Sequence, residues 1–175
     1  MTKKVAVIAV NPVNGYGLFH YLESFYENNI PYKVFAVAES KDIKTNSGIS
    51  IEVDDTVSGL KGHADEYDAL VFACGDAIPV FSQHARESYN IDMFSVIKEF
   101  NDKGKLMIGH CAAAMMFEKA GAAEGKKFAI HPLAKVALKK NTPMEEKTVI
   151  DGNFYTAQEE HYLSQLMPEI LKALK

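Results

Sequence analysis

Short apolar runs alternate along the chain with longer segments whose apolar residues recur at helical spacing. The apolar runs, which are typical of strands covered on both faces of a sheet, occupy residues 5–10, 32–38, 68–74 and 105–109. The helical segments occupy residues 18–28, 91–103, 112–119 and 159–175. Asp151-Gly152, between short apolar runs, predicts a hairpin. This alternation predicts an α/β fold, a three-layer sandwich with a mainly parallel sheet and helices on both faces.

The length and composition fit one globular domain. The chain has 175 residues, of which 47% are hydrophobic and 24% are charged, so it can bury a substantial core without disulfides or metals. We expect a single domain over residues 1–175. The net charge of −4 creates no global positive field, and neither a nucleic acid nor a membrane is expected as a partner.

The cysteines indicate the compartment. Cys74 and Cys111 are the two cysteines of the chain, and they form no CxxC motif and no cluster at metal-ligand spacing. Free thiols in a reducing compartment and no metal site are therefore expected. The first apolar run, residues 5–10, is too short for a signal peptide or a membrane span. A cytoplasmic location is expected.

The strongest functional signal is Gly109-His110-Cys111-Ala112-Ala113, where an expected strand turns into a helix with almost no loop. In open parallel sheets, functional residues lie beyond the carboxyl ends of the strands. Small residues around the turn are typical of the elbow that presents a nucleophile, and amides at the start of the helix favour a thiolate. The pattern predicts a reactive Cys111 on strained backbone. A buried structural cysteine is the alternative.

Other residues are expected beside this cysteine. His131 follows another short apolar run, and we expect it to polarise the thiol or move protons, or else to be structural. Gly75 and Asp76 end the neighbouring strand, and their backbone amides are expected to form an anion hole with that of Ala112. An ordinary strand-ending glycine is the alternative for Gly75.

Two further residues near these turns are expected to be structural. Because neighbouring strand residues point to opposite faces, His110 should point away from Cys111 and be either satisfied or partly exposed. Cys74 comes just before Gly75, and a second reactive thiol is the alternative to a structural role there.

Together these residues resemble the ThiJ/PfpI superfamily, which includes intracellular-protease-like proteins and the parkinsonism-associated protein deglycase. The resemblance runs from Lys4 to Leu174, and its most specific parts are residues 109–113, 131–135 and 149–156. It implies a flavodoxin-like, class I glutamine amidotransferase-like fold that is often dimeric. It also implies Cys111 as nucleophile or redox-sensing thiol, His131 as its partner and Gly75 near the oxyanion site.

The chain departs from this superfamily pattern at three places. A glutamate usually follows the first strand and hydrogen-bonds the cysteine sulfur, but residues 11–19 contain no acid. The protease-like branch has His after the Cys, where this chain has Ala112, and Asp76 interrupts a glycine pair. Tyr16 has the longest reach of the candidate donors, so we expect its phenol to replace the carboxyl. The alternative is that Tyr16 only shields the pocket.

We therefore expect a cysteine-dependent hydrolase or lyase of the ThiJ/PfpI type that acts on a small carbonyl or amide compound, without a cofactor. One alternative is a non-enzymatic redox-sensing or stress-response protein that oxidises Cys111. Another is a flavodoxin-like flavin-binding protein. The resemblance implies a homodimer.

Overall fold

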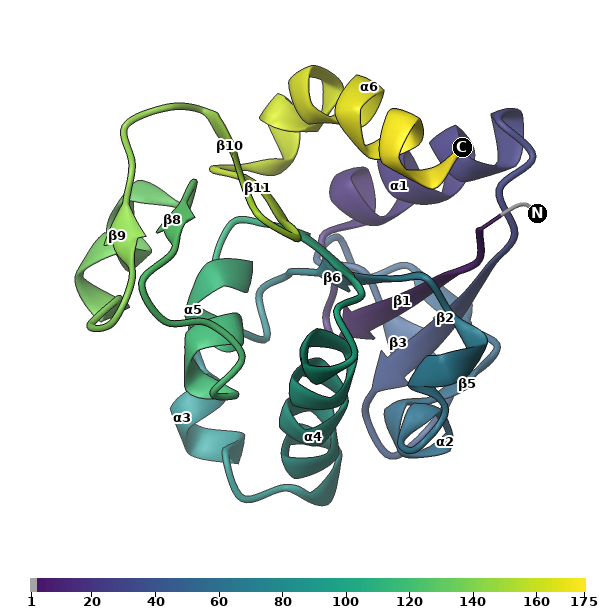
Figure 1. Cartoon of the computed structure of the whole chain (residues 1–175). Helices are drawn as coiled ribbons and strands as arrows, with labels where there is room; N and C mark the ends of the chain where they lie inside the picture. Colours follow the sequence, from purple (N-terminus) through teal and green to yellow (C-terminus); the bar gives the residue numbers. More distant parts are fainter. Residues whose placement is uncertain (1–2) are drawn as a thin grey trace.

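A seven-stranded sheet runs through the structure, a computed structural model that describes residues 3–175 (Figure 1). The strands lie in the order β10-β11-β7-β6-β1-β2-β5, and all neighbours are parallel except β10 and β11. Their bounds are β1 Val5–Val10, β2 Tyr32–Val37, β5 Asp55–Thr56, β6 Ala69–Ala73, β7 Leu106–His110, β10 Thr148–Asp151 and β11 Phe154–Ala157. The expected mainly parallel sheet and the expected hairpin are both confirmed.

Helices cover both faces of this sheet, as predicted. α1 (Gly15–Glu27) and α6 (Leu163–Leu174) lie together on one side, and α4 (Ser88–Asp102) and α5 (Ala113–Lys119) lie on the other (Figure 1). The short elements are β3 Asp42–Lys44, β4 Ser50–Glu52, α2 Val57–Leu60, η1 Ala64–Glu66, α3 Phe81–His84, β8 Lys127–Phe128, η2 Pro132–Ala137, β9 Thr142–Pro143 and η3 Glu160–Tyr162. Among residues 3–175, no helix has the length and apolar character needed to cross a bilayer.

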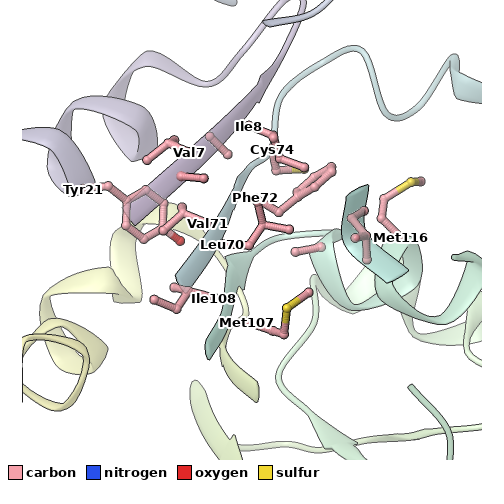
Figure 2. Packing of buried hydrophobic residues seen from close by; sticks show 14 of the residues in the cluster. Val7, Ile8, Tyr21, Leu70, Val71, Phe72, Cys74, Met107, Ile108 and Met116 are labelled. Carbon is pink, nitrogen blue, oxygen red and sulfur yellow. The ribbon is translucent and has the colours of Figure 1, made fainter. Parts of the chain in front are cut away.

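The strand side chains divide into two packed layers. Figure 2 shows Val71 beside Tyr21 of α1, whereas Phe72 points the other way, toward Met116 of α5. All four side chains are fully buried. Burying a large apolar side chain contributes about 1.5–3 kcal/mol, so the central strands are held from both sides and their carboxyl ends are fixed in place.

Two helices differ in their bounds from the predicted ones. The helix expected at 18–28 begins three residues earlier, at Gly15, because the Asn14 side chain accepts a hydrogen bond from Gly17 N–H at 2.6 Å. The helix expected at 159–175 is divided into η3 and α6. The apolar face predicted for the helix at 91–103 is confirmed, since Met93, Ile97 and Phe100 of α4 are buried.

Candidate functional site

Cys111 occupies the turn that joins β7 to α5, at the carboxyl edge of the sheet. Its φ angle is +58°, in the left-handed region that costs a residue with a side chain about 1–2 kcal/mol. The strained backbone predicted for this residue is confirmed. The turn is tight, because a Cβ on Gly109 would overlap the Cβ of Ala113.

Gly75 follows β6, the neighbour of β7, and therefore lies beside this turn. The loop before α1 packs directly on Gly75. A Cβ on Gly75 would overlap the carbonyl oxygen of Pro12 and the Cα of Val13. The loop is fixed there by a 2.9 Å hydrogen bond from Asn14 N–H to the carbonyl oxygen of Cys74. A glycine is therefore required by close backbone approach, and the carboxyl ends of β1, β6 and β7 meet at one point.

The two thiols are hydrogen-bonded to each other. Cys74 is 2% exposed, and its thiol donates to the sulfur of Cys111, which is half-buried and faces a pocket. This hydrogen bond is the main cause that lowers the pKa of Cys111, and the Ala112 N–H adds to it against the effect of burial. The pKa of Cys74 is raised well above its ordinary value by the same hydrogen bond and then by burial. Cys111 is therefore the thiol that ionises first.

Two of the three amides expected in the anion hole point at these sulfurs. Ala112 N–H donates to both cysteines, and Gly75 N–H donates to Cys74. The role expected for the third amide, that of Asp76, was wrong. Asp76 N–H donates to the side-chain oxygen of Asn46 at 3.0 Å, so it is not free for an oxyanion. Asp76 still lines the pocket.

The position of Tyr16 overturns the donor role expected for it. Tyr16 is 59% exposed, and its ring packs against His161 with centroids 5.2 Å apart. The buried face of α1 carries Gly17, Leu18, Tyr21 and Phe25, so Tyr16, one position before this face begins, points outward. The thiol of Cys74 provides the donor instead.

His131 reaches the same pocket, but its hydrogen bonds lead elsewhere. Its backbone N–H donates to the carbonyl oxygen of Cys111 at 3.0 Å. The ring Nδ1 accepts a hydrogen bond from Leu133 N–H at 3.2 Å, and Nε2 lies 3.6 Å from Glu159 Oε1. Because Nδ1 is an acceptor, the neutral ring carries its proton on Nε2. His131 therefore offers a donor to the pocket rather than a free base.

His110 differs from the expected satisfied or partly exposed residue. It is 1% exposed, and its Nδ1 lies 3.1 Å from the hydroxyl of Tyr21. Its Nε2 is buried without a partner among the described residues 3–175, and it packs against Gly17, where a Cβ would lie 2.7 Å away. Burial, followed by the charge of His20, lowers the pKa of His110 to about 3, so the ring is neutral.

The pocket around Cys111 has a volume of about 660 Å³, within the range of small-molecule sites. Three carboxylates line it, those of Asp76, Glu159 and Glu160, and no lysine or arginine of residues 3–175 does. Glu160 and Glu159 oppose ionisation of Cys111 and raise its pKa, although the two hydrogen bonds prevail. The pocket is therefore acidic around a thiol whose pKa is lower than that of an ordinary cysteine.

Sequence reasoning missed four residues of this site, Cys74 as the thiol's partner, Glu159, Glu160 and Asn46. The sequence did contain a signal for the role of Cys74 as the partner of the thiol. β6 and β7 pair with an offset of 37 residues, from Ala69 with Leu106 to Phe72 with Gly109, and the two cysteines are the same 37 residues apart. Asn46 and Glu159 lie on loops and Glu160 begins η3, and no local pattern specifies how these segments pack.

Comparisons with known proteins agree with this architecture. The model of the DJ-1/PfpI family matches residues 3–173. The protein ppBat of Bacteroides thetaiotaomicron is 60% identical over 175 residues, which cover 100% of both chains. A crystal structure from the same organism, titled "putative protease I", is 60% identical and superposes with a TM-score of 0.97 over 99% of each chain.

Two more distant structures share the fold. A mutant of a DJ-1 superfamily protein from Salmonella typhimurium is 20% identical, with a TM-score of 0.85 over 98% of this chain and 90% of that one. Drosophila melanogaster DJ-1beta is 19% identical, with a TM-score of 0.85 over 99% of this chain and 91% of that one. The flavodoxin-like sandwich is thereby confirmed.

Proposed function

The chain belongs to the DJ-1/PfpI family, and from that premise we propose that it is a cysteine-dependent hydrolase or lyase acting on a small carbonyl or amide compound. The observation that carries the proposal is the hydrogen bond from Cys74 to Cys111, because it lowers the pKa of the thiol that faces the pocket. A lower pKa makes more of this thiol available as the nucleophilic thiolate, which lessens the need for a separate base. The relative titled "putative protease I" supports a hydrolase.

In this mechanism the Cys111 thiolate attacks the electrophilic carbon of the substrate. Its negative charge passes to the substrate oxygen as the carbon–sulfur bond forms. The Ala112 amide, which donates to Cys111 in the free protein, loses a charged acceptor at that moment, and the Gly75 amide beside it donates only to the neutral Cys74 thiol. We assign them to the oxyanion, since backbone N–H groups fixed where charge develops stabilise the transition state.

We assign proton donation to His131. Its Nδ1 is engaged by Leu133 N–H, so the proton available to substrate is the one on Nε2. Glu159 Oε1 lies 3.6 Å from this nitrogen and limits where the ring can swing. In the neutral ring this N–H would donate a hydrogen bond to the developing oxyanion. Protonation of a leaving amine would need the imidazolium, which forms when Nδ1 leaves Leu133 N–H and takes a proton from solvent.

The pocket supports a substrate that is neutral or cationic. The carboxylates of Asp76, Glu159 and Glu160 line it, and no lysine or arginine of residues 3–175 does. A substrate carboxylate or phosphate would meet like charge in a partly desolvated space, at a cost of several kcal/mol. Small aldehydes, uncharged amides and peptides with a free amino terminus meet no such barrier.

The test is a turnover screen with the reduced protein on methylglyoxal, small amides and short peptides. Cys111→Ser is the matched variant, because it keeps the size of the side chain and removes the thiolate. We expect turnover by the native protein with at least one class and a loss of about a hundredfold or more in Cys111→Ser. Turnover that Cys111→Ser retains would contradict the assignment of the nucleophile.

A redox-sensing function is the second candidate, and the Cys74–Cys111 contact favours it. A thiolate held beside a buried thiol is susceptible to oxidation whether or not it turns over a substrate. A reactive Cys111 without turnover in any of the three substrate classes would select this function.

Assembly and location complete the proposal. We propose a homodimer that buries a groove between α1 and residues 45–49, because Tyr16, Phe19 and Ile49 line this groove and are exposed. We also propose a cytoplasmic location, because both cysteines are free and free thiols persist in a reducing compartment.

A further inference from the structure

The backbone places the two cysteines opposite each other. β6 and β7 pair in parallel with an offset of 37 residues, and Cys74 and Cys111 continue that register just past the strand ends. Neighbouring strands lie about 4.8 Å apart. That separation is inside the range of about 4.4–6.8 Å between the Cα atoms of disulfide-bonded cysteines. The backbone geometry is therefore compatible with a bond between these residues.

The side chains complete this arrangement and make it asymmetric. Both cysteines line the same pocket, and the hydrogen bond from Cys74 that lowers the pKa of Cys111 places the two sulfurs close together. Cys111 is half-buried at the pocket, whereas Cys74 is 2% exposed beneath it. A small oxidant entering the pocket therefore reaches Cys111 first, and the oxidised sulfur has Cys74 as its nearest nucleophile.

We propose that the Cys74–Cys111 pair is a two-cysteine oxidation site, in which a peroxide oxidises Cys111 and Cys74 then closes an intramolecular disulfide. In the first step the Cys111 thiolate attacks one oxygen of hydrogen peroxide and the O–O bond breaks. The departing hydroxide takes up a proton, which leaves Cys111 sulfenic acid and water. In the second step Cys74 loses its proton, its sulfur attacks the Cys111 sulfur, and the S–O bond breaks to release a second water. The two thiols supply the two electrons that reduce the peroxide.

The first oxidation prepares the second step. The largest cause that raises the pKa of Cys74 is its hydrogen bond with Cys111. Conversion of Cys111 to a neutral sulfenic acid removes the charged acceptor of that bond. The amides of Ala112 and Gly75 still donate to Cys74 and favour its thiolate. Because attack within one molecule also has a large effective concentration, disulfide closure should outrun a second peroxide.

The test exposes the reduced native protein to hydrogen peroxide, first in equimolar amount and then in excess, with peptide mapping under non-reducing conditions. We expect one linked peptide pair that contains Cys74 and Cys111 and has lost two hydrogens. Dithiothreitol should restore both thiols. Accumulation of Cys111 sulfinic acid with Cys74 still a free thiol would overturn the proposal, as would a disulfide between two chains.

Two variants assign the roles of the two sulfurs. Cys74→Ser should leave Cys111 to proceed to the sulfinic acid, and dimedone should trap its sulfenic acid at least about tenfold more than in the native protein. Cys111→Ser should leave Cys74 reduced at the same peroxide dose. Equal dimedone trapping in the native protein and in Cys74→Ser would contradict the resolving role. These readouts need no substrate, so they can fail while the proposed enzymatic function stands, and the reverse is equally possible.

Discussion

The thiol of Cys74 donates a hydrogen bond to the sulfur of Cys111 at the carboxyl ends of two neighbouring parallel strands. The superfamily resemblance implies a carboxyl donor from the loop after the first strand, and this chain has no acid there. The donor comes from the adjacent strand instead. A thiol donor differs from a carboxyl in one respect that matters chemically, because it can itself be oxidised.

The charge of Glu160, which lines the pocket, should lower the reactivity of Cys111. Glu160 raises the pKa of Cys111 by its charge, and its Oε1 accepts a hydrogen bond from Asn14 Nδ2 at 3.2 Å. Glu160→Gln removes the charge and keeps an acceptor, so alkylation of Cys111 at pH 7 should rise by about twofold. Glu146→Gln, an exposed acid outside the pocket, is the control and should change nothing. Slower alkylation in Glu160→Gln would refute this reading.

Gly17 should be intolerant of a side chain. A Cβ there would lie 2.7 Å from the Nε2 of His110, and overpacking of this kind costs about 1–3 kcal/mol of the free energy of unfolding. Gly15→Ala is the control in the same helix, where the nearest atom would be 3.3 Å away and the gain in helix propensity offsets the crowding. Urea unfolding measures the free energy of unfolding of Gly17→Ala and of Gly15→Ala. Equal losses in the two variants would show that the contact with His110 does not decide the cost.

The buried His110 should make stability fall in mild acid. Its pKa is about 3 in the folded protein, against 6.5 for an unperturbed histidine. Between these values the unfolded chain binds a proton that the folded protein does not, so the free energy of unfolding falls as the pH falls. The slope from this group approaches about 1.4 kcal/mol per pH unit. His110→Gln should remove this part of the slope between pH 6.5 and 5, and parallel curves for the two proteins would argue against it.

The groove between α1 and residues 45–49 should control assembly. If a second copy covers this groove, the native protein should sediment at about twice the monomer mass of 19.4 kDa. Phe19→Glu should yield monomers, because it places a charge in the groove. Tyr26→Glu is the control, since Tyr26 is exposed on the same helix but does not line the groove. A native protein that is monomeric at micromolar concentration would exclude a stable dimer.

Local patterns were sufficient for the sheet, the hairpin and the strained turn, because apolar runs, Asp151-Gly152 and small residues at 109–113 each act within a few residues. They did not predict the environment of the sulfur. The direction of Tyr16 depends on where α1 begins, which the Asn14 cap sets. The amide of Asp76 is taken by Asn46, which is 30 residues earlier in the chain. Cys74 was identified as a strand end, but its partner depends on the register between two strands.

The most direct test of this account is the pH dependence of Cys111 alkylation by iodoacetamide, followed by peptide mass spectrometry, in the native protein, Cys74→Ala and Tyr16→Phe. A hydrogen bond to a charged acceptor contributes about 1.5 kcal/mol or more, so its loss should reduce the thiolate fraction at pH 7 about tenfold. A thiolate of higher pKa is intrinsically more nucleophilic, and this offsets part of the loss in thiolate fraction. The alkylation rate of Cys111 in Cys74→Ala should therefore be roughly threefold lower.

We predict that the midpoint for Cys111 lies below that of an ordinary thiol in the native protein and in Tyr16→Phe, and that it moves upward in Cys74→Ala. A midpoint that is unchanged in Cys74→Ala, or one that moves in Tyr16→Phe instead, would contradict the role assigned to the Cys74 thiol.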